Sequence, residues 1–130
     1  GVSEMKLGDI SPTRDFNYVE DTCRGIISLI DCEDSIGEVV NIGSNFEISI
    51  SETLEKIKKI MKSNIKFVVD SKRIRPESSE VNRLWCDNSK IIKLTDFKPQ
   101  VTLDEGLKKT IEWFSEPRNL EGYKPDIYNV

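Results

Sequence analysis

The stretch Thr13-Arg14-Asp15-Phe16-Asn17-Tyr18-Val19-Glu20-Asp21 marks the change from extended chain to helix. Pro12 precedes it and favours extended backbone at the residue before the proline. After this stretch begins, apolar residues recur at the spacing of one helix face, at Val19, Cys23, Ile26, Ile27 and Ile30. The spacing predicts a helix of about three turns that ends before Ser35-Ile36-Gly37.

Two further helices are predicted by capping boxes. Ser49 with Glu52, and Thr102 with Glu105, have the spacing at which a hydroxyl and a carboxylate satisfy each other's backbone N–H groups. Ser51 is the alternative cap for the first of these helices. Apolar residues follow both boxes at helical spacing, and a shorter helix is expected after Asn88.

The extended segments are few and short. We expect them at 6–9, 39–42, 47–50, 66–69 and 84–86, and the apolar run 39–42 should be a buried strand. Polar residues 70–83 should form a long loop, and residues 115–130 an irregular tail. The chain is therefore predicted to be a mixed α/β domain, helix-rich, whose few strands are too short for an independent doubly wound sheet.

Length and composition exclude several function classes. The 130 residues indicate one domain over 1–130, and a net charge of −4 argues against general affinity for nucleic acid. Three Cys and no His exclude a Cys/His zinc site and suggest free thiols in a reducing compartment. No apolar run approaches the roughly 20 residues of a membrane span, so we expect a cytoplasmic protein with no membrane partner.

The usual catalytic and cofactor motifs are missing from the sequence. Without His there is no Ser-His-Asp or Cys-His arrangement, and no Tyr is followed four residues later by Lys. There is no Gly-x-Gly-x-x-Gly for a dinucleotide pyrophosphate and no P-loop. We therefore assign no catalytic, cofactor-binding or metal-binding residue to this chain.

Charged residues near the first helix allow two interpretations. Glu20 and Asp21 could serve acid/base or Mg²⁺ chemistry, but at a helix N-terminus they more simply offset the helix dipole. Arg14 and Arg75, the latter beside Arg73, could grip a diphosphate with their planar forks of donors. The alternative is that each arginine is only a solvated surface residue.

The order of several short motifs resembles a known family. The motifs are Ser11-Pro12-Thr13-Arg14-Asp15-Phe16, Asn41-Ile42-Gly43, Arg75-Pro76 to Ser79-Glu80-Val81, Arg83-Leu84, Lys98-Pro99 and Asp126-Ile127-Tyr128-Asn129. Together they resemble the C-terminal part of the extended short-chain dehydrogenase/reductases, the NAD-dependent nucleotide-sugar epimerases and dehydratases. The subgroup that looks most similar is the 4,6-dehydratases of UDP- or GDP-linked N-acetylglucosamine.

The resemblance implies roles for matching residues. Arg14 and Arg75 should bind the substrate diphosphate and Asn41 should lie near the nucleotide. Arg73 could replace Arg75, because the loop here is longer than in many relatives. Asp15 should orient a loop rather than take part in chemistry.

The resemblance also implies that NAD or NADP and the catalytic Tyr and Lys belong to the N-terminal half of a longer parent. This chain alone should therefore be inactive, with a nucleotide sugar and the missing Rossmann domain as its partners. In the parent, hydride removal from the sugar would precede loss of water. The alternatives are the same lobe of a UDP-sugar 4-epimerase, or a non-catalytic interaction module that self-associates as a homodimer.

Overall fold

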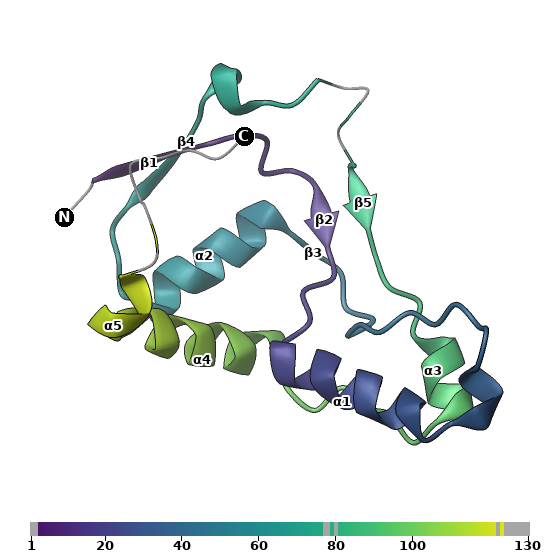
Figure 1. The fold of residues 1–130 in the computed structure, drawn as a ribbon. Helices are drawn as coiled ribbons and strands as arrows, with labels where there is room; N and C mark the ends of the chain where they lie inside the picture. The colour runs from purple at the N-terminus through teal and green to yellow at the C-terminus, as the bar shows by residue number, and fades with distance from the viewer. Residues whose placement is uncertain (1–2, 77–78, 80, 122, 124–130) are drawn as a thin grey trace.

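The computed structural model describes residues 3–76, 79, 81–121 and 123, and its strands form two small sheets (Figure 1). In the first sheet, β1 (Glu4–Leu7) runs parallel to β4 (Lys66–Val69). In the second, β2 (Thr13–Arg14) lies between β3 (Ile48–Ser49) and β5 (Arg83–Leu84). The β2 strand is antiparallel to β3 and parallel to β5.

Helices make up most of the regular structure, as the sequence predicts. They are α1 (Val19–Ile30), α2 (Ile50–Ile60), α3 (Ser89–Leu94), α4 (Leu103–Ser115) and α5 (Pro117–Leu120), with single turns η1 (Glu33–Ser35) and η2 (Ser71–Arg73). Figure 1 shows α1 along one edge of the molecule, with α4 continuing that edge and α2 lying above α4. The predicted mixed α/β, helix-rich fold is confirmed.

Both predicted capping boxes are confirmed, and they fix where α2 and α4 begin. The Glu52 backbone N–H donates to the Ser49 hydroxyl (3.1 Å), and the Ser49 N–H donates to the Glu52 carboxylate (3.0 Å). Thr102 and Glu105 repeat the arrangement, with the Thr102 N–H 2.9 Å from the Glu105 carboxylate. Each box satisfies donors that the first helical turn leaves without an intrahelical partner.

The buried apolar core of the described residues is small, and α1 contributes little to it. Ile48, Ile91 and Phe97 are its buried apolar side chains. By contrast, the apolar stripe of α1 faces solvent, with Ile27 59% and Ile30 75% exposed. A helix with an amphipathic pattern normally buries that stripe, so among the described residues no layer covers the apolar stripe of α1.

The prediction of a buried strand at 39–42 is wrong. These residues belong to no strand or sheet, and Val39 is 85% exposed. The reason is that a strand requires a neighbour for its backbone groups, and the described part of the chain supplies none at this position.

The irregular tail expected over 115–130 is corrected in its first residues. The α4 helix includes Ser115, and Pro117 opens α5, because proline at the first helical position loses no intrahelical hydrogen bond. The motif Asp126-Ile127-Tyr128-Asn129 and the rest of the tail from 124 lie outside the described residues, as do Glu77, Ser78 and Glu80 of the 70–83 loop.

Candidate functional site

Asp15, directly after β2, ties the loop that follows Asn41-Ile42-Gly43 to the central sheet. Its carboxylate accepts hydrogen bonds from the Ser44 N–H (3.1 Å), the Ser44 hydroxyl (2.5 Å) and the Asn45 N–H (2.9 Å). Asn45 has a positive φ of 58°, in the left-handed region that asparagine adopts more readily than most residues. The prediction that Asp15 orients a loop is confirmed.

Gly43 is required at this junction because another segment passes very close to it. A Cβ on Gly43 would lie 2.5 Å from Cys86 Cβ and 2.6 Å from Cys86 Sγ. The buried Asn88 side chain donates to the Gly43 carbonyl at 3.0 Å. Three distant segments thus meet around one glycine, which holds the loop in a fixed position next to β2.

Arg14 is half-buried in β2, between Ile48 of β3 and Leu84 of β5. One guanidinium N–H donates to the Thr13 carbonyl at 2.7 Å. Arg14 therefore belongs to the central strand of the three-stranded sheet, and pairing with β3 and β5 restricts the backbone that carries its guanidinium.

A clamp centred on Glu47 links the same three strands. Glu47 accepts bonds from Arg83 Nε and Nη2, each at 2.7 Å, and from the Thr13 hydroxyl at 2.5 Å. Hydrogen bonds from Arg83, followed by the bond from Thr13, lower the pKa of Glu47 from 4.5 to about 2. Arg83 also lies over the Trp85 ring, with 5.3 Å between the guanidinium carbon and the ring centroid.

Arg75 lies exposed on the 70–83 loop, and both ends of this loop are anchored. At the first end, the Asp70 N–H donates to the Leu7 carbonyl of β1 (2.8 Å). At the second end, the Thr13 N–H donates to the Asn82 carbonyl (2.9 Å), next to Arg14. The loop that carries Arg75 is therefore joined directly to the strand that carries Arg14.

Arg73 and Asn41, the other two predicted site residues, lie in different settings. Arg73 is half-buried in η2, and its Nε lies 3.9 Å from a carboxylate oxygen of Asp70. Its carbonyl oxygen would be 2.5 Å from a Cβ on Gly8, so the turn packs tightly on the chain after β1. Asn41 is exposed, on the extended segment that enters the Asp15 junction.

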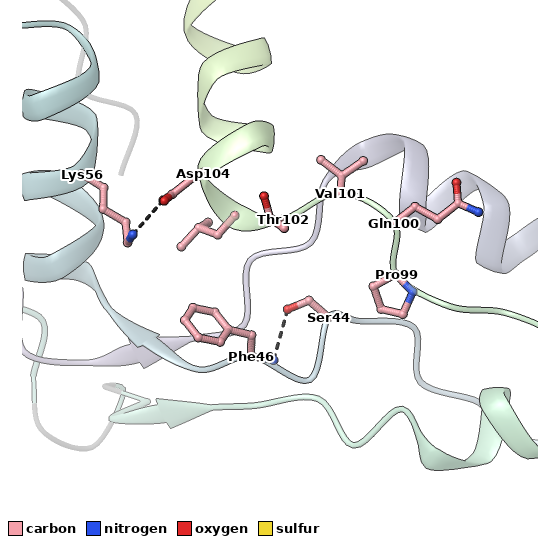
Figure 2. A pocket seen from close by; sticks show the side chains of 9 residues that line it. Ser44, Phe46, Lys56, Pro99, Gln100, Val101, Thr102 and Asp104 are labelled. Carbon is pink, nitrogen blue, oxygen red and sulfur yellow. Dashed lines mark hydrogen bonds and ion pairs between the residues drawn. The ribbon is translucent and has the colours of Figure 1, made fainter.

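A pocket of about 390 Å³ lies beside this junction and was not expected from the sequence. It is formed by the loop 44–46, by α2 and by the segment that leads into α4, with Ser44, Phe46, Lys56, Pro99, Gln100, Val101, Thr102, Leu103 and Asp104 as lining residues. Figure 2 shows the Lys56–Asp104 ion pair (2.7 Å) across one side. The sequence feature that could have indicated this pocket is Phe46, an aromatic residue in a polar loop two positions before Ile48.

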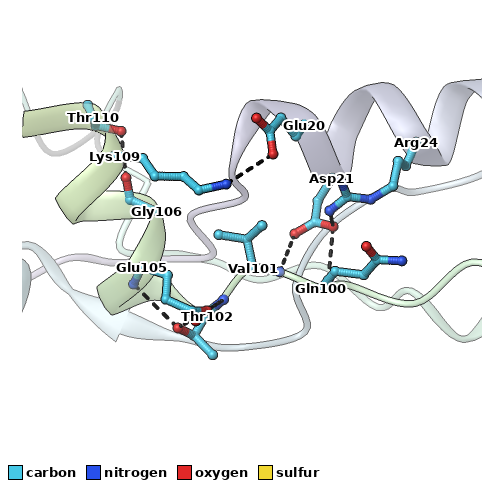
Figure 3. A network of polar contacts seen from close by, with 10 residues as sticks. All are labelled: Glu20, Asp21, Arg24, Gln100, Val101, Thr102, Glu105, Gly106, Lys109 and Thr110. Carbon is cyan, nitrogen blue, oxygen red and sulfur yellow. Dashed lines mark hydrogen bonds and ion pairs between the residues drawn. The ribbon is translucent and has the colours of Figure 1, made fainter. Parts of the chain in front are cut away.

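The buried carboxylate of Asp21 is structural (Figure 3). It accepts hydrogen bonds from the Gln100 and Val101 N–H groups, both at 2.9 Å, and from Arg24. Burial opposes ionisation of Asp21, but these bonds outweigh it and lower its pKa below 3.8. Glu20 and Asp21 do lie in the first turn of α1, as the dipole interpretation requires, yet Asp21 also fixes one wall of the pocket.

Metal and membrane sites find no support in the structure. Across residues 3–76, 79, 81–121 and 123, no three His, Cys, Asp or Glu side chains are grouped so as to hold a metal ion. In the same residues, no helix combines the length and apolar character needed to cross a bilayer.

Comparison with known proteins now identifies the family. The family model described as GDP-mannose 4,6 dehydratase matches residues 2–110. The chain belongs to this family. Its relatives include nucleotide-sugar decarboxylases and epimerases of the extended short-chain dehydrogenase/reductase type, so the family-level resemblance seen in the sequence is confirmed.

Two curated relatives show how much of such proteins this chain represents. It is 37% identical over 117 residues to a UDP-N-acetyl-alpha-D-glucosaminuronate decarboxylase of Bacillus cytotoxicus, covering 88% of the chain and 36% of the relative. It is 31% identical to a UDP-glucuronate 4-epimerase of Thermodesulfobacterium geofontis, covering 88% of the chain and 33% of the relative. The chain spans about a third of the length of the curated relatives it matches.

Solved structures agree with the fold of this family member. An epimerase of Methanothermobacter thermautotrophicus superposes with a TM-score of 0.80 at 32% identity, covering 91% of this chain and 34% of that one. A UDP-glucuronic acid 4-epimerase of Bacillus cereus, in complex with UDP-glucuronic acid and NAD, gives 0.76 at 29% identity, covering 86% and 35%. The matched part of these enzymes is again about a third of their length.

Proposed function

We propose that this chain is the nucleotide-sugar-binding part of an NAD- or NADP-dependent enzyme. Arg14 and Arg75 bind the substrate diphosphate, Asn41 lies near the nucleotide, and Arg73 is the alternative to Arg75. A diphosphate needs more than one cationic partner, and the planar fork of a guanidinium matches the oxygens of a phosphate group.

The observation that carries this proposal is the bond between the Thr13 N–H and the Asn82 carbonyl. It joins the Arg75 loop to the strand of Arg14, so two arginines 61 positions apart in sequence (75 − 14) belong to one connected unit. The clamp of Glu47 with Thr13 and Arg83 stabilises the same connection. A fixed connection between the two segments would reduce the ordering cost of binding a flexible diphosphate.

The dinucleotide does not fit the described residues of this chain. A pyrophosphate cradle needs glycines in the turn between a strand and a helix N-terminus. Gly8, Gly25, Gly37, Gly43 and Gly106 are described, and none of them occupies such a turn. We therefore assign the cofactor and the reacting side chains to the length of the relatives outside the match, and we expect this chain alone to be inactive.

The specific reaction proposed is 4,6-dehydration of a UDP- or GDP-linked N-acetylglucosamine in the cytoplasm. The dehydratase family model and the motif order support this reaction. The second candidate is 4-epimerisation of a UDP sugar, which the names of the epimerase relatives favour. In both cases this chain contributes substrate position and charge neutralisation, and not the bond-breaking groups.

Titration calorimetry with UDP, GDP and UMP at low salt tests the binding role. We expect weak binding that favours the diphosphates over the monophosphate and that falls at least tenfold in Arg14→Ala and in Arg75→Ala, about 1.4 kcal/mol each. Arg118→Ala, in the exposed α5, is the matched control and should bind as the wild type does. Diphosphate binding that survives the loss of both Arg14 and Arg75 would refute the assigned roles.

A further inference from the structure

The Glu47 clamp lies on the face of the three-stranded sheet that is opposite Arg14. Arg14 is in register with Leu84 of β5, and Thr13 is in register with Arg83. Because successive strand residues point to opposite faces, Arg14 lies on one face of the sheet and Thr13 on the other. The Glu47 carboxylate contacts Thr13 and Arg83, and it therefore lies on the second face. Glu47 is thus placed to hold strands together on the side away from Arg14.

The clamp spans the whole sheet, from one outer strand to the other across β2. Glu47 directly precedes β3, and its two carboxylate oxygens accept hydrogen bonds from Nε and Nη2 of Arg83 in β5, each at 2.7 Å. This bidentate geometry fixes the orientation of the guanidinium as well as its distance. The Thr13 hydroxyl of β2 donates a third bond to one of the same oxygens. One carboxylate therefore joins segments from all three strands.

Burial contributes little to holding β5 in place. This strand contains two residues, and the side chain of Arg83 is 65% exposed while Leu84 is 60% exposed. A short strand without a buried apolar face is held mainly by its hydrogen bonds. The side-chain bonds of the clamp are therefore a substantial part of what keeps β5 against β2.

The position of β5 sets one end of the loop that carries Arg75. Asn82 directly precedes β5, and its carbonyl accepts the Thr13 N–H at 2.9 Å. If β5 moves away from β2, this end of the loop moves with it, and the position of Arg75 relative to Arg14 is no longer restricted. Binding of a diphosphate by both arginines then includes the cost of ordering the loop.

We infer that Glu47 is a positioning residue for diphosphate binding, which acts through Arg83 on the loop that carries Arg75. This inference rests on the proposed function, in which Arg14 and Arg75 bind the diphosphate. A carboxylate in contact with a diphosphate would repel it. Glu47 avoids this repulsion, because it lies on the face opposite Arg14 and its charge is paired with that of Arg83.

NMR titration with UDP at low salt tests this role in the wild type, Glu47→Gln, Arg75→Ala and the double variant. We expect Glu47→Gln to lower the affinity for UDP about fivefold in the wild-type background. In the Arg75→Ala background the same change should lower it less than about twofold, because the loop no longer carries a ligand-binding side chain. Glu55→Gln, the same change of charge at an exposed residue of α2, is the matched control and should bind UDP as the wild type does.

Hydrogen exchange without ligand tests the connection between the clamp and the loop. The Thr13 amide, which donates to Asn82, should exchange about tenfold faster in Glu47→Gln and at the wild-type rate in Glu55→Gln. An unchanged exchange rate in Glu47→Gln would show that the clamp does not hold β5 and would overturn the inference.

The outcomes of the titration separate this inference from the proposed function. If Glu47→Gln binds UDP as tightly as the wild type, Glu47 does not position the site, and the binding role of the arginines stands. If Glu47→Gln loses affinity equally with and without Arg75, its effect comes from stability or net charge, which also overturns the inference alone. A wild type that does not bind UDP refutes the proposed function itself, and the inference fails with it.

Discussion

Replacing Asp21 by Asn should destabilise the chain far more than an ordinary isosteric change on a helix. The carboxylate is fully buried and accepts the N–H groups of Gln100 and Val101, each at 2.9 Å. An amide can keep its oxygen toward Gln100 and Arg24, but its nitrogen then faces the Val101 N–H. One buried donor without an acceptor costs about 1–3 kcal/mol, and loss of charge on the remaining bonds adds about 1 kcal/mol.

The expected loss is therefore roughly 2–4 kcal/mol, which urea unfolding can resolve by the fluorescence of Trp85 and Trp113. With a slope of about 2 kcal/mol per molar urea, the midpoint should fall by about 1–2 M. Glu20→Gln is the matched control, because this exposed neighbour has only a surface ion pair with Lys109 (3.2 Å) and should change stability by less than about 0.5 kcal/mol.

The pH dependence gives an independent check on Asp21. Its folded-state pKa lies below 3.8, so its stabilisation is complete above that value and is lost as pH falls through the folded-state pKa. Asp21→Asn should remove the contribution of this carboxylate to the loss of stability at low pH. A midpoint within about 0.3 M of the wild type at neutral pH would show that the loop at 100–101 does not need the carboxylate.

Three other variants test the junction, the clamp and a helix cap by the same unfolding assay. Gly43→Ala places a Cβ 2.5 Å from Cys86 Cβ and should cost about 1–3 kcal/mol, and a smaller loss when Cys86→Gly is already present would confirm the clash. Glu47→Gln should flatten the fall in stability with acid, because the lowered pKa of about 2 makes the wild type lose this contribution as pH drops below 4.5. If stability falls equally with decreasing pH in the wild type and in Glu47→Gln, the clamp does not stabilise the fold as proposed. Thr102→Ala should cost about 1 kcal/mol through loss of its cap to the Glu105 N–H, and an unchanged midpoint would contradict that role.

Features encoded by neighbouring residues could be predicted from the sequence. Both capping boxes and the α1 spacing follow from short patterns, because the residues of each pattern lie within a few turns of one helix. The orienting role of Asp15, whose partners Ser44 and Asn45 lie 29 and 30 positions away, was implied only by the family resemblance. The sequence predicts an irregular tail over 115–130 and so does not predict α5, although Pro117 is well suited to the first turn of a helix.

Features that depend on distant segments could not be predicted in the same way. The apolar run at 39–42 encodes a preference for extended backbone, but whether it becomes a strand depends on a neighbour that the sequence of the run does not specify. The pocket beside Phe46 likewise forms only where three distant segments meet. In the sequence, 44–46 is a loop, Lys56 is on the surface of a helix, and 99–104 is the capped start of another helix. The Arg14 and Arg75 roles stay predictions for the binding assay.

The bonds from Asp21 to Gln100 and Val101 also have a consequence for how the chain folds. During synthesis, α1 emerges before residues 100 and 101, so the Asp21 carboxylate can accept its two backbone N–H groups only after residue 101 has been made. The parallel pairs β1–β4 and β2–β5 impose the same delay, since their strands are about 60–70 residues apart. Folding is therefore expected to be slow and largely post-translational, with the apolar side chains of α1 exposed on the nascent chain until its C-terminal half arrives.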